Sequence, residues 1–430
     1  MRTSKMYISK IYKRQINYEH IINKITVDSR TVENNDVFVA ISGMVKDGND
    51  YIKEAIKNGA KTIITEQKCY YPEVNVIVIE NARKELGRIL KIINEKIMKK
   101  IKIIGVTGTN GKTTTTTLVH KYLKELNIDS ALIGSNGVYY ANKYFEGINT
   151  TPDITIIYDI ICEAFKLDCR YFILEVSSHA IKQLRVFGIE FDIVLFTNLT
   201  LDHLDYHNDF TDYKYTKGLL MASVKESNYV ILNRDSEYYH FYENIVKAKI
   251  ISFGTSNSTF LIKDIKLKDN ETEFKITFKN HEIAIKTNLL GMFNVYNICS
   301  LVAIITALNL FNEEKLNSFF QRKIIIPGRM EEINYKDRKI IIDFAHTPDG
   351  LLNILNAVKG CRHARIITVF GCGGNRDKGK RPLMGKIACD LSDIVIITSD
   401  NPREENPADI IDDIVSGVDG TYSNYYRIEN

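Results

Sequence analysis

Cysteine is sparse in this 430-residue sequence and never forms a paired motif. The seven cysteines, with no C-x-x-C spacing among them, are Cys69, Cys162, Cys169, Cys299, Cys361, Cys372 and Cys389. An odd number of widely separated cysteines argues against a disulfide framework. A reducing compartment is therefore the expected environment.

Long apolar segments are absent as well. The first 20 residues, MRTSKMYISKIYKRQINYEH, contain no apolar core of a signal peptide, and no uninterrupted apolar run approaches the roughly 18 residues of a membrane span. The formal net charge of +4 is spread over many lysines and glutamates, and by itself it predicts no nucleic-acid binding. We therefore expect a cytoplasmic protein without membrane insertion or a nucleic-acid partner, and we expect it to be monomeric.

Internal repeats and low-complexity tracts are also missing, and 430 residues exceed one ordinary core. Residues 1–99 alternate short β-like runs with helical ones, which predicts a small α/β domain. Residues 100–327 repeat strand-then-helix units. Their apolar strands predict a parallel sheet covered on both faces, with an alternating antiparallel insert between residues 252 and 288. Residues 328–430 contain three more buried-type strands, RKIIIDFAH, ARIITVFGC and DIVIITSD, and predict another α/β domain.

The glycine-rich loop GVTGTNGKT stands between the strand-like IKIIGV and the helix-like KTTTTTLVHKYLKEL. Backbone N–H groups at a helix start favour an anion, and glycines let the backbone approach phosphate oxygens. Lys112 is placed to reach the β- and γ-phosphates, and Thr113 to hold Mg²⁺. The strict pattern G-x-x-x-x-G-K-[ST] is missed, because Val106 stands at its first glycine; a βα turn that binds nothing is the alternative. We predict a nucleoside triphosphate site whose loop residues are Gly108, Thr109, Asn110, Gly111, Lys112, Thr113 and Thr114.

Two further strand-like runs are followed by polar residues. In LEVSSHAIKQLR, Glu175 stands at a strand end, where a parallel sheet has its ligand crevice, and is placed like a Mg²⁺ ligand. A surface glutamate is the alternative. In FTNLTLDHLDYH, His203 and His207 have the spacing of a zinc pair on a helix, but no third ligand is convincingly spaced. We prefer a single imidazole on a second Mg²⁺, with helix capping by either histidine as the other interpretation.

Motifs in all three blocks follow one another in the order of a known family: VDSRTVENNDVFVAISG, GTNGKT, NTTPD, EVSSHA, TNLTLDHLDYH, GMFNVYN, PGRMEEI, DFAHTPDGL and GCGGNRDKGKRPLMGKIA. The chain thereby resembles the Mur ligases over nearly its whole length. The resemblance implies an α/β fold of three domains: residues 1–99 for the UDP end of the substrate, 100–327 as a central ATPase with a P-loop-type parallel sheet, and 328–430 as a Rossmann-like domain for an amino acid. It also implies an ATP-dependent ligase of peptidoglycan synthesis. In such a ligase a carboxylate is phosphorylated and an amine then attacks the acyl phosphate.

The resemblance also assigns roles to single residues. A carbamylated lysine, which acts as an anionic Mg²⁺ ligand, falls on Lys217 in DYKYTKGLLM; without the resemblance, Lys217 reads as an ordinary helix-surface lysine. The catalytic residues implied are Lys112, Glu175, His203 and Lys217, and the metal ligands are Thr113, Glu175, His203 and Lys217. The implied contacts to the UDP-N-acetylmuramoyl dipeptide are Ser29, Asn149, Thr150, Thr151, Ser177, Gln183 and Arg185. Further residues implied around ATP are Asn297, Arg329, Asp343 and His346.

The resemblance implies meso-diaminopimelate as the amino acid. In SDNPREENP, the residues Asp400, Asn401, Pro402 and Arg403 match the motif of the family's diaminopimelate ligases, and Arg376 in GGNRD falls on another contact. Diaminopimelate carries a second carboxylate that an arginine binds, whereas an arginine repels the ammonium group of lysine. A structural loop is the alternative, because Asn-Pro is itself a turn signal.

The sequence departs from the family's pattern in three places. The family continues beyond YYRIEN with another helix and strand to a Gly-Lys-Gly-His-Glu segment whose Gly and Glu also contact the amino acid, and these 430 residues end before it. Part of that site is therefore expected to be missing, either by truncation or in a shortened relative with a changed acceptor. Asn375 stands where the family usually has aspartate, and Asn49 where it often has histidine. Two alternatives stay open: a ligase for lysine or another acceptor amine, and a degenerate relative that binds UDP-muramoyl peptide without turnover. The intact Lys112, Thr113, Glu175, His203 and Lys217 argue against the second, and the missing tail argues for it.

Overall fold

The structure is a computed structural model that describes residues 6–13, 16–43, 46–147, 149–336, 338–360, 365–418 and 420–429. Cys361 lies outside the described residues. The chain divides into two compact units, one made of Met1–Ile104 and Asp129–Phe191, the other of Gly105–Ile128 and Asp192–Asn430. Within the described ranges, no helix is both long and apolar enough to cross a bilayer.

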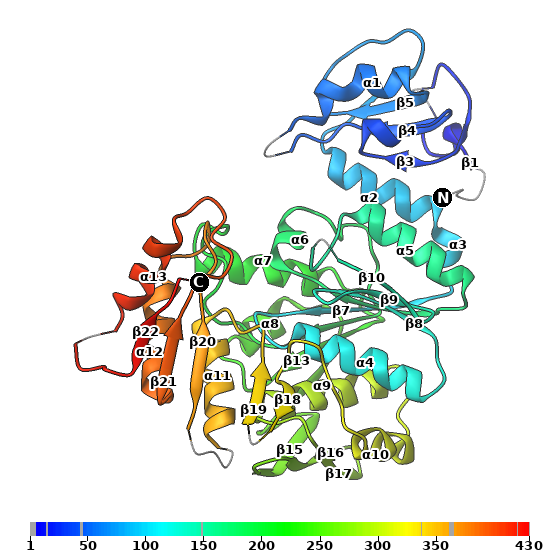
Figure 1. Ribbon diagram of the computed structural model, residues 1–430. Helices are drawn as coiled ribbons and strands as arrows, with labels where there is room; N and C mark the ends of the chain where they lie inside the picture. The colour runs from blue at the N-terminus through cyan, green and yellow to red at the C-terminus, as the bar shows by residue number, and fades with distance from the viewer. Residues whose placement is uncertain are drawn as a thin grey trace. The chain divides into compact units, whose positions relative to one another are not determined.

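The N-terminal part of the first unit contains a parallel sheet in the strand order β3-β4-β5-β6 (Figure 1). Its strands are β3 (Ile25–Thr26), β4 (Asp36–Val39), β5 (Ala60–Thr65) and β6 (Asn75–Val78), and the short antiparallel pair β1 (Met6–Tyr7) and β2 (Ile21–Ile22) precedes it. Helix α1 (Ile52–Lys57) packs on β5 and buries Ile52 and Ala55 against Phe38 and Ile63. This confirms the small α/β arrangement expected at the start of the chain.

The rest of the first unit carries a second set of strands. Strand β8 (Ser130–Gly134) pairs in parallel with β11 (Tyr171–Glu175) and antiparallel with β9 (Gly137–Tyr140), which pairs with β10 (Lys143–Phe145). The helices are α2 (Ala82–Ile93), α3 (Glu95–Met98), α5 (Ile154–Lys166) and α6 (Ser178–Lys182). Strand β11 therefore ends at Glu175, as the sequence predicts, and α6 begins three residues later.

Strand β7 (Lys102–Thr107) leads into the glycine loop, and the second unit continues from there with α4 (Lys112–Glu125). Its sheet has the order β12-β13-β14-β15-β16-β17, with parallel pairing from β12 to β15 and antiparallel pairing from β15 to β17. The strands are β12 (Ile193–Phe196), β13 (Tyr229–Asn233), β14 (Lys249–Gly254), β15 (Phe260–Leu267), β16 (Thr272–Phe278) and β17 (His281–Thr287). Alternate residues of β16 are buried, which confirms the antiparallel insert.

The helices of this sheet are α4, α7 (Phe210–Ala222), α8 (Tyr239–Ile245), α9 (Met292–Ala307) and α10 (Glu313–Gln321). Helix α9 is apolar around most of its circumference and is buried from Asn297 to Ile305, which is the pattern of a central helix. It packs against α4. The threonines that follow Lys112 have poor helix propensity, but Thr113 to Thr117 are all buried, and Thr115 donates to Oδ1 of Asn297 in α9 at 3.3 Å. Tertiary packing therefore stabilises the first turns of α4.

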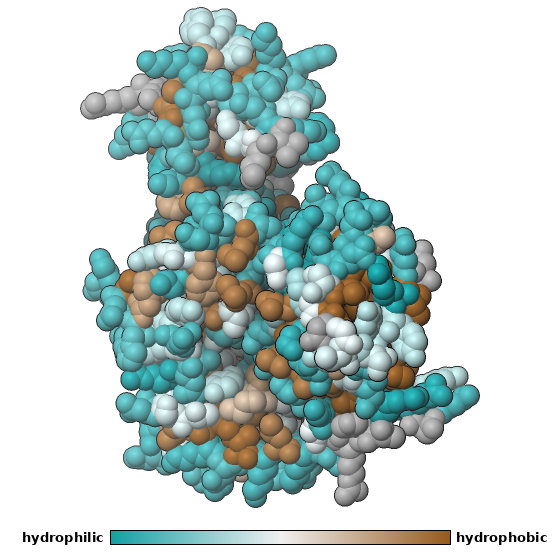
Figure 2. Space-filling model, turned by 90° about the vertical axis from the view of Figure 1, so that its left-hand side faces the viewer, coloured by the Kyte–Doolittle hydropathy of each residue, from teal (hydrophilic) through white to brown (hydrophobic). Residues whose placement is uncertain are grey.

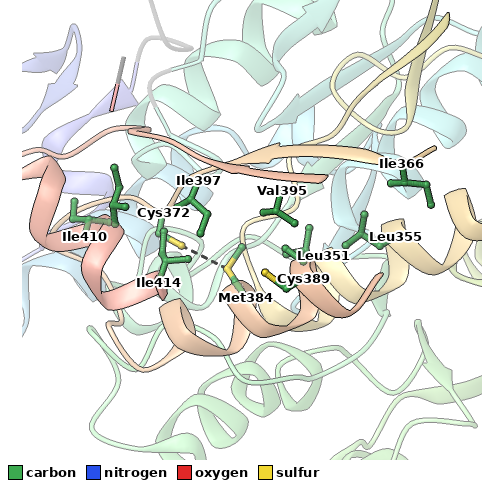
Figure 3. Close-up of a cluster of buried hydrophobic side chains, with 12 residues drawn as sticks. Leu351, Leu355, Ile366, Cys372, Met384, Cys389, Val395, Ile397, Ile410 and Ile414 are labelled. Carbon is green, nitrogen blue, oxygen red and sulfur yellow. Dashed lines mark hydrogen bonds between the residues drawn. The ribbon is translucent and has the colours of Figure 1, made fainter. Parts of the chain in front are cut away.

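The C-terminal part of the second unit contains a parallel sheet in the order β20-β21-β22, shown in orange and red in Figure 1. Its elements are α11 (Pro348–Lys359), β20 (Ile367–Phe370), α12 (Lys380–Leu391), β21 (Ile394–Ile397), α13 (Pro407–Val415) and β22 (Tyr425–Arg427). Val395 and Ile397 point from β21 toward Met384 of α12, and Ile414 of α13 lies in the same cluster (Figure 3). One apolar core thus joins the strands to these helices.

One expectation for this part is wrong. The segment RKIIIDFAH does form a strand, β19 (Arg338–Ile342), but β19 pairs antiparallel with β18 (Glu331–Tyr335), and Ile340 is exposed. Only a short connection joins β18 to β19, and a short connection imposes antiparallel pairing. In β20, Ile367 and Val369 are also exposed, whereas Thr368 is buried.

The face in Figure 2 is mostly hydrophilic, with several patches where apolar side chains reach the surface.

Candidate functional site

The glycine loop has the backbone geometry of an anion cradle. Gly111 is the N-cap of α4 with a φ of 84°, and no side chain caps the helix. A Cβ on Gly111 would lie 2.6 Å from Oδ1 of Asn297, and one on Gly108, where φ is 146°, would lie 1.9 Å from Oγ1 of Thr197. Val106 is a buried residue of β7, so the turn begins at Gly108 and needs no glycine at position 106. Helix α4 therefore starts from a turn in which a side chain at position 108 or 111 would clash, and such a turn lets the backbone approach an anion closely.

The residues that follow β12 hold this loop in place. Asn198 accepts the Thr109 N–H through its carbonyl oxygen at 2.9 Å and the Asn110 N–H through its Oδ1 at 2.9 Å. The Thr197 hydroxyl donates to the Asn110 carbonyl oxygen at 2.6 Å. Asn198 was not among the predicted site residues, although it lies in the quoted motif TNLTLDHLDYH directly after a strand.

Two lysines converge on the loop. Lys112 donates from Nζ to the carbonyl oxygens of Gly108 and Thr109, at 2.8 Å each. Lys217, from α7, donates to the same Gly108 oxygen at 3.0 Å, and only 1% of its surface is exposed. Lys217 is thus not the helix-surface lysine that its sequence context indicates. Burial lowers the pKa of Lys217 well below the ordinary value of a lysine; nearby Lys112 lowers it further, and Asp202 opposes the shift.

Asp202 is buried beside this pair and faces two histidines and a lysine. Its carboxylate lies 3.3 Å from Nε2 of His203, 3.7 Å from Nε2 of His346 and 3.9 Å from Nζ of Lys380. Burial alone would raise the pKa of Asp202, but these neighbours hold it below its usual value. Burial likewise lowers the pKa of His346, and Asp202 opposes that shift. The structure therefore brings His203 and His346 together around Asp202, a residue of the motif TNLTLDHLDYH that has no role among the predicted site residues.

The helical zinc pair considered for His203 and His207 has no structural basis. The residues from 201 to 209 form turns rather than a helix, and His203 has a φ of 57°. The N-cap of α7 is Asp209, so neither histidine caps it. His207 is buried against the Tyr213 ring, with a centroid separation of 5.1 Å. Among the described residues, no group of three or more His, Cys, Asp or Glu could hold a metal ion by itself.

A pocket of about 400 Å³ adjoins the glycine loop. Its wall combines apolar side chains such as Phe253 and Leu289 with polar ones such as Asn294 and Asp349, the mixture typical of a small-molecule site. Asp349 also accepts a hydrogen bond from Nδ2 of Asn110 at 2.8 Å. The predicted ATP residues that line this pocket are Asn110, Gly111, Thr114, Asn297, Arg329, Asp343 and His346.

Arg329 and Asp343 connect the pocket to the C-terminal part of the unit. Arg329 donates from Nη2 to the Thr113 hydroxyl at 3.1 Å, and its guanidinium lies 4.8 Å from the centroid of the Phe344 ring. Asp343 accepts the N–H groups of Met330 and Ala345 at 2.8 Å each. Burial raises the pKa of Asp343.

Several predicted residues of the first unit also gather in one place. The buried Glu175 carboxylate accepts the Ser135 N–H at 2.9 Å and the Ser135 hydroxyl at 3.2 Å, and that hydroxyl lies 3.0 Å from the Thr150 hydroxyl. The Thr151 hydroxyl donates to the Glu175 carbonyl oxygen at 2.8 Å and accepts the Ser177 N–H at 3.0 Å. Glu175 is therefore not a surface glutamate. Ser135 was missed by the sequence analysis, and no motif pointed to it.

The remaining predicted residues of this unit lie around the same elements or apart from them. Arg185 donates from Nη1 to the Thr151 carbonyl oxygen at 3.0 Å, while Gln183 is the C-cap of α6. Asn149 is exposed. Ser29 lies in the sheet region that begins the unit, where its hydroxyl donates to Oε2 of Glu54 at 2.6 Å.

The predicted diaminopimelate residues lie on two loops of the C-terminal part. Arg376 is on the loop after β20, with Nη1 3.3 Å from Oδ2 of Asp205. Arg403 is on the loop after β21, has a φ of 50° and donates from Nη1 to the Gly374 carbonyl oxygen at 2.7 Å. Asp400 and Asn401 are exposed on the second loop, and Pro402 lies beside them. The two loops are in contact, so both arginines belong to one region.

Replacing Gly111 with alanine tests the cradle. Because Gly111 has a positive φ and no room for a Cβ, we expect Gly111→Ala to lower the free energy of unfolding by about 1–2 kcal/mol and to weaken the thermal stabilisation by ATP. Thermal unfolding with and without ATP measures both effects. Gly420→Ala is the matched control, because a Cβ there meets nothing within 4 Å. An unchanged response of Gly111→Ala to ATP would contradict the cradle.

The fold and the loop define a class: an α/β protein with a phosphate-loop turn between a strand and a helix. Family models match the chain over three ranges: the Mur ligase family catalytic domain over residues 21–102, the Mur ligase middle domain over 106–307, and the Mur ligase glutamate ligase domain over 328–430. The UDP-N-acetylmuramoyl-L-alanyl-D-glutamate–2,6-diaminopimelate ligase of Clostridium perfringens is 40% identical over 420 residues, which are 95% of this chain and 85% of that protein. The ligase of the same name from Aquifex aeolicus is 38% identical over 404 residues, covering 92% and 81%.

Solved structures agree with these matches. A structure of a UDP-N-acetylmuramoyl-L-alanyl-D-glutamate–2,6-diaminopimelate ligase is similar with a TM-score of 0.76 and 28% identity, over 99% of this chain and 89% of that one. The fold is also similar to that of Mycobacterium tuberculosis folylpolyglutamate synthase, with a TM-score of 0.67 and 13% identity over 81% of this chain and 86% of that one. The chain belongs to the Mur ligase family.

Proposed function

We propose that this ligase uses ATP to add meso-diaminopimelate to UDP-N-acetylmuramoyl-L-alanyl-D-glutamate. The observation that carries the proposal is the pocket beside the glycine loop, where predicted nucleotide residues from both sides of position 328 line one cavity. Relatives that cover nearly the whole chain bear the name of this reaction. We also propose a cytoplasmic location, because the reaction uses ATP. We further propose that residues 1–99 receive the UDP end, residues 100–327 bind ATP and residues 328–430 bind the amino acid, in a monomeric enzyme.

The bonds change in two steps. An oxygen of the substrate's terminal carboxylate attacks the γ-phosphorus of ATP, the bond to the β-phosphate oxygen breaks, and ADP leaves. The amine then attacks the carbonyl carbon of the acyl phosphate; the amide forms, inorganic phosphate leaves, and the nitrogen loses a proton. Both reacting groups are anionic in the first step. Lys112 and the N–H groups at the start of α4 therefore contribute by holding and neutralising phosphate oxygens.

Mg²⁺ fits the donor groups present. In the second unit, the hydroxyl of Thr113 and the imidazole of His203 would hold it, together with Lys217 once a carbamate makes that side chain anionic. The buried carboxylate of Glu175, in the first unit, is a further ligand that the resemblance to the family implies. Bound Mg²⁺ would neutralise phosphate charge during transfer. The surroundings of Lys217 favour a carbamate, because burial next to Lys112 stabilises the uncharged amine from which a carbamate forms.

The contacts of the first unit suit a peptide carboxylate. Thr150, Thr151, Ser177 and Arg185 gather beside Glu175 and offer hydroxyl and guanidinium donors. Ser29, Asn149 and Gln183 complete the proposed UDP-muramoyl-dipeptide site. For the amino acid, Arg376 and Arg403 on adjacent loops would bind the carboxylate that distinguishes diaminopimelate from lysine.

Phosphate release with UDP-N-acetylmuramoyl-L-alanyl-D-glutamate, ATP and a panel of amino acids tests the proposal. We expect turnover with meso-diaminopimelate and at least about tenfold lower kcat/KM with lysine, because the ammonium group of lysine faces an arginine. Turnover with lysine and not diaminopimelate would contradict the role of Arg403. Tight ATP binding without turnover of any amino acid would favour a non-catalytic relative.

A further inference from the structure

Arg381 is a fully buried arginine that the reaction described above does not use. It lies in the first turn of α12, and its side chain has 0% exposure. Its guanidinium donates to both carboxylate oxygens of Glu405, at 2.9 and 3.0 Å, to Oδ2 of Asp413 at 2.7 Å and to the Gly373 carbonyl oxygen at 3.2 Å. A buried arginine is retained only with such partners, because an unpaired buried charge is costly.

Two of these partners belong to the loops that carry Arg376 and Arg403. Gly373 lies on the first loop, between β20 and α12, and Glu405 on the second, between β21 and α13. Glu405 also accepts the N–H of Asn375, so its carboxylate reaches the first loop as well. Hydrogen bonds to Arg381 contribute most to holding the pKa of Glu405 at about 2, so this carboxylate is ionised throughout the neutral range.

The rest of the contact between the loops depends on close backbone approach. The Gly374 N–H donates to the Asn401 carbonyl oxygen at 2.8 Å, and Arg403 donates to the Gly374 carbonyl oxygen at 2.7 Å. A Cβ on Gly374 would lie 1.9 Å from the Pro402 carbonyl oxygen. Asn375 accepts the Glu404 N–H at 3.1 Å through Oδ1. The Arg403 side chain is thus oriented by a loop whose position depends on the other loop.

We propose that Arg381 is a positioning residue that sets amino-acid selectivity: by clamping Glu405 beneath both loops, it fixes Arg403 where the second carboxylate of the amino acid must lie. This inference rests on the proposed function. Arg381 does not touch the amino acid in this arrangement. Arg381 acts through Glu405, because the loop of Glu405 also carries Arg403. The planar guanidinium of Arg381 can bind both carboxylate oxygens of Glu405 at once, which the ammonium group of a lysine cannot do.

Three single substitutions test the inference, with steady-state kinetics for diaminopimelate, lysine and ATP. Arg381→Lys keeps the charge and loses the fork, and Glu405→Gln keeps the shape and loses the charge. We expect each to raise the KM for diaminopimelate about tenfold or more and to lower the preference over lysine, while the KM for ATP stays within about twofold. Asp413→Asn is the matched control, because Asp413 binds Arg381 but lies on α13 outside both loops. It should leave the preference unchanged.

Thermal unfolding separates this role from a purely structural one. If Arg381→Lys does not fold, Glu405→Gln alone decides the question. Folded variants with wild-type KM and preference would overturn the inference, and so would an equal loss of kcat for every amino acid without a change of preference. The double substitution should cost less than the sum of the two single ones, because both break the same contact. A wild-type protein that does not use diaminopimelate would instead contradict the proposed function itself, and this result is available before any variant is compared.

Discussion

Lys112→Ala will abolish ATP-driven amide formation, with a loss of kcat of at least about 100-fold, while the chain keeps its fold. The ammonium group of Lys112 lies 2.8 Å from two carbonyl oxygens of the glycine loop, at the positive end of α4. In the proposed reaction, transfer of the γ-phosphoryl group moves negative charge between oxygens that Lys112 would hold, and alanine removes the only side-chain cation that the loop itself supplies. Phosphate release and amide formation, measured together, report the loss.

Lys124→Ala is the control for this experiment. Lys124 is exposed in the last turn of the same helix, far along α4 from the loop, so its removal changes helix charge without touching the cradle. We expect this variant to keep kcat within about twofold. Wild-type turnover by Lys112→Ala would contradict the interpretation of the glycine loop as a phosphate-binding loop.

Lys217→Met will lower kcat by at least about 100-fold as well, for a different reason. The side chain is buried, its Nζ lies 3.0 Å from the Gly108 carbonyl oxygen, and the centroid of the Tyr213 ring is 4.7 Å away. An uncharged amine in this position can add CO₂: a C–N bond forms, a proton is released, and the side chain becomes an anionic carbamate. Methionine fills the same space but cannot form it, so the expected loss is one of charge rather than of packing.

Three measurements check the role of Lys217. Turnover should fall in CO₂-depleted buffer and recover when bicarbonate is returned, and ¹³C NMR with labelled bicarbonate should show a carbamate signal that Lys217→Met lacks. Lys214→Met is the control, because Lys214 lies one turn earlier on α7, where its ammonium contacts the Phe241 ring at 4.5 Å instead of the loop. It should keep the response to CO₂. An active wild-type enzyme without a carbamate signal, or an active Lys217→Met, would refute this role.

The two lysines show how far sequence patterns reach. For Lys112 the local pattern is sufficient to predict the position of the side chain. An apolar strand, a glycine loop and a helix start follow one another directly, and together they put Lys112 at the first turn of the helix. For Lys217 the local pattern misleads, because a lysine on a helix is usually exposed to solvent, whereas Lys217 lies in a buried stretch of α7 together with Thr216 and Gly218. Only the resemblance to the Mur ligases pointed to it. The hydrogen bond from Lys217 to the Gly108 carbonyl oxygen joins residues that are 109 positions apart.

The sequence by itself determined the α/β class, the strand that ends at Glu175, the antiparallel insert and the phosphate-loop turn. Each of these follows from hydrophobic periodicity or from the closely spaced glycines of one loop, which act over a few residues. Tertiary structure alone decided that Asp202 meets His346 and Lys380, that Ser135 binds Glu175, that Arg381 clamps Glu405, and that the segment RKIIIDFAH joins a hairpin rather than a parallel sheet. Those contacts depend on which distant segments pack together. A buried charged group or hydroxyl forms hydrogen bonds with the groups that the fold places next to it, and the local sequence does not predict which groups these are.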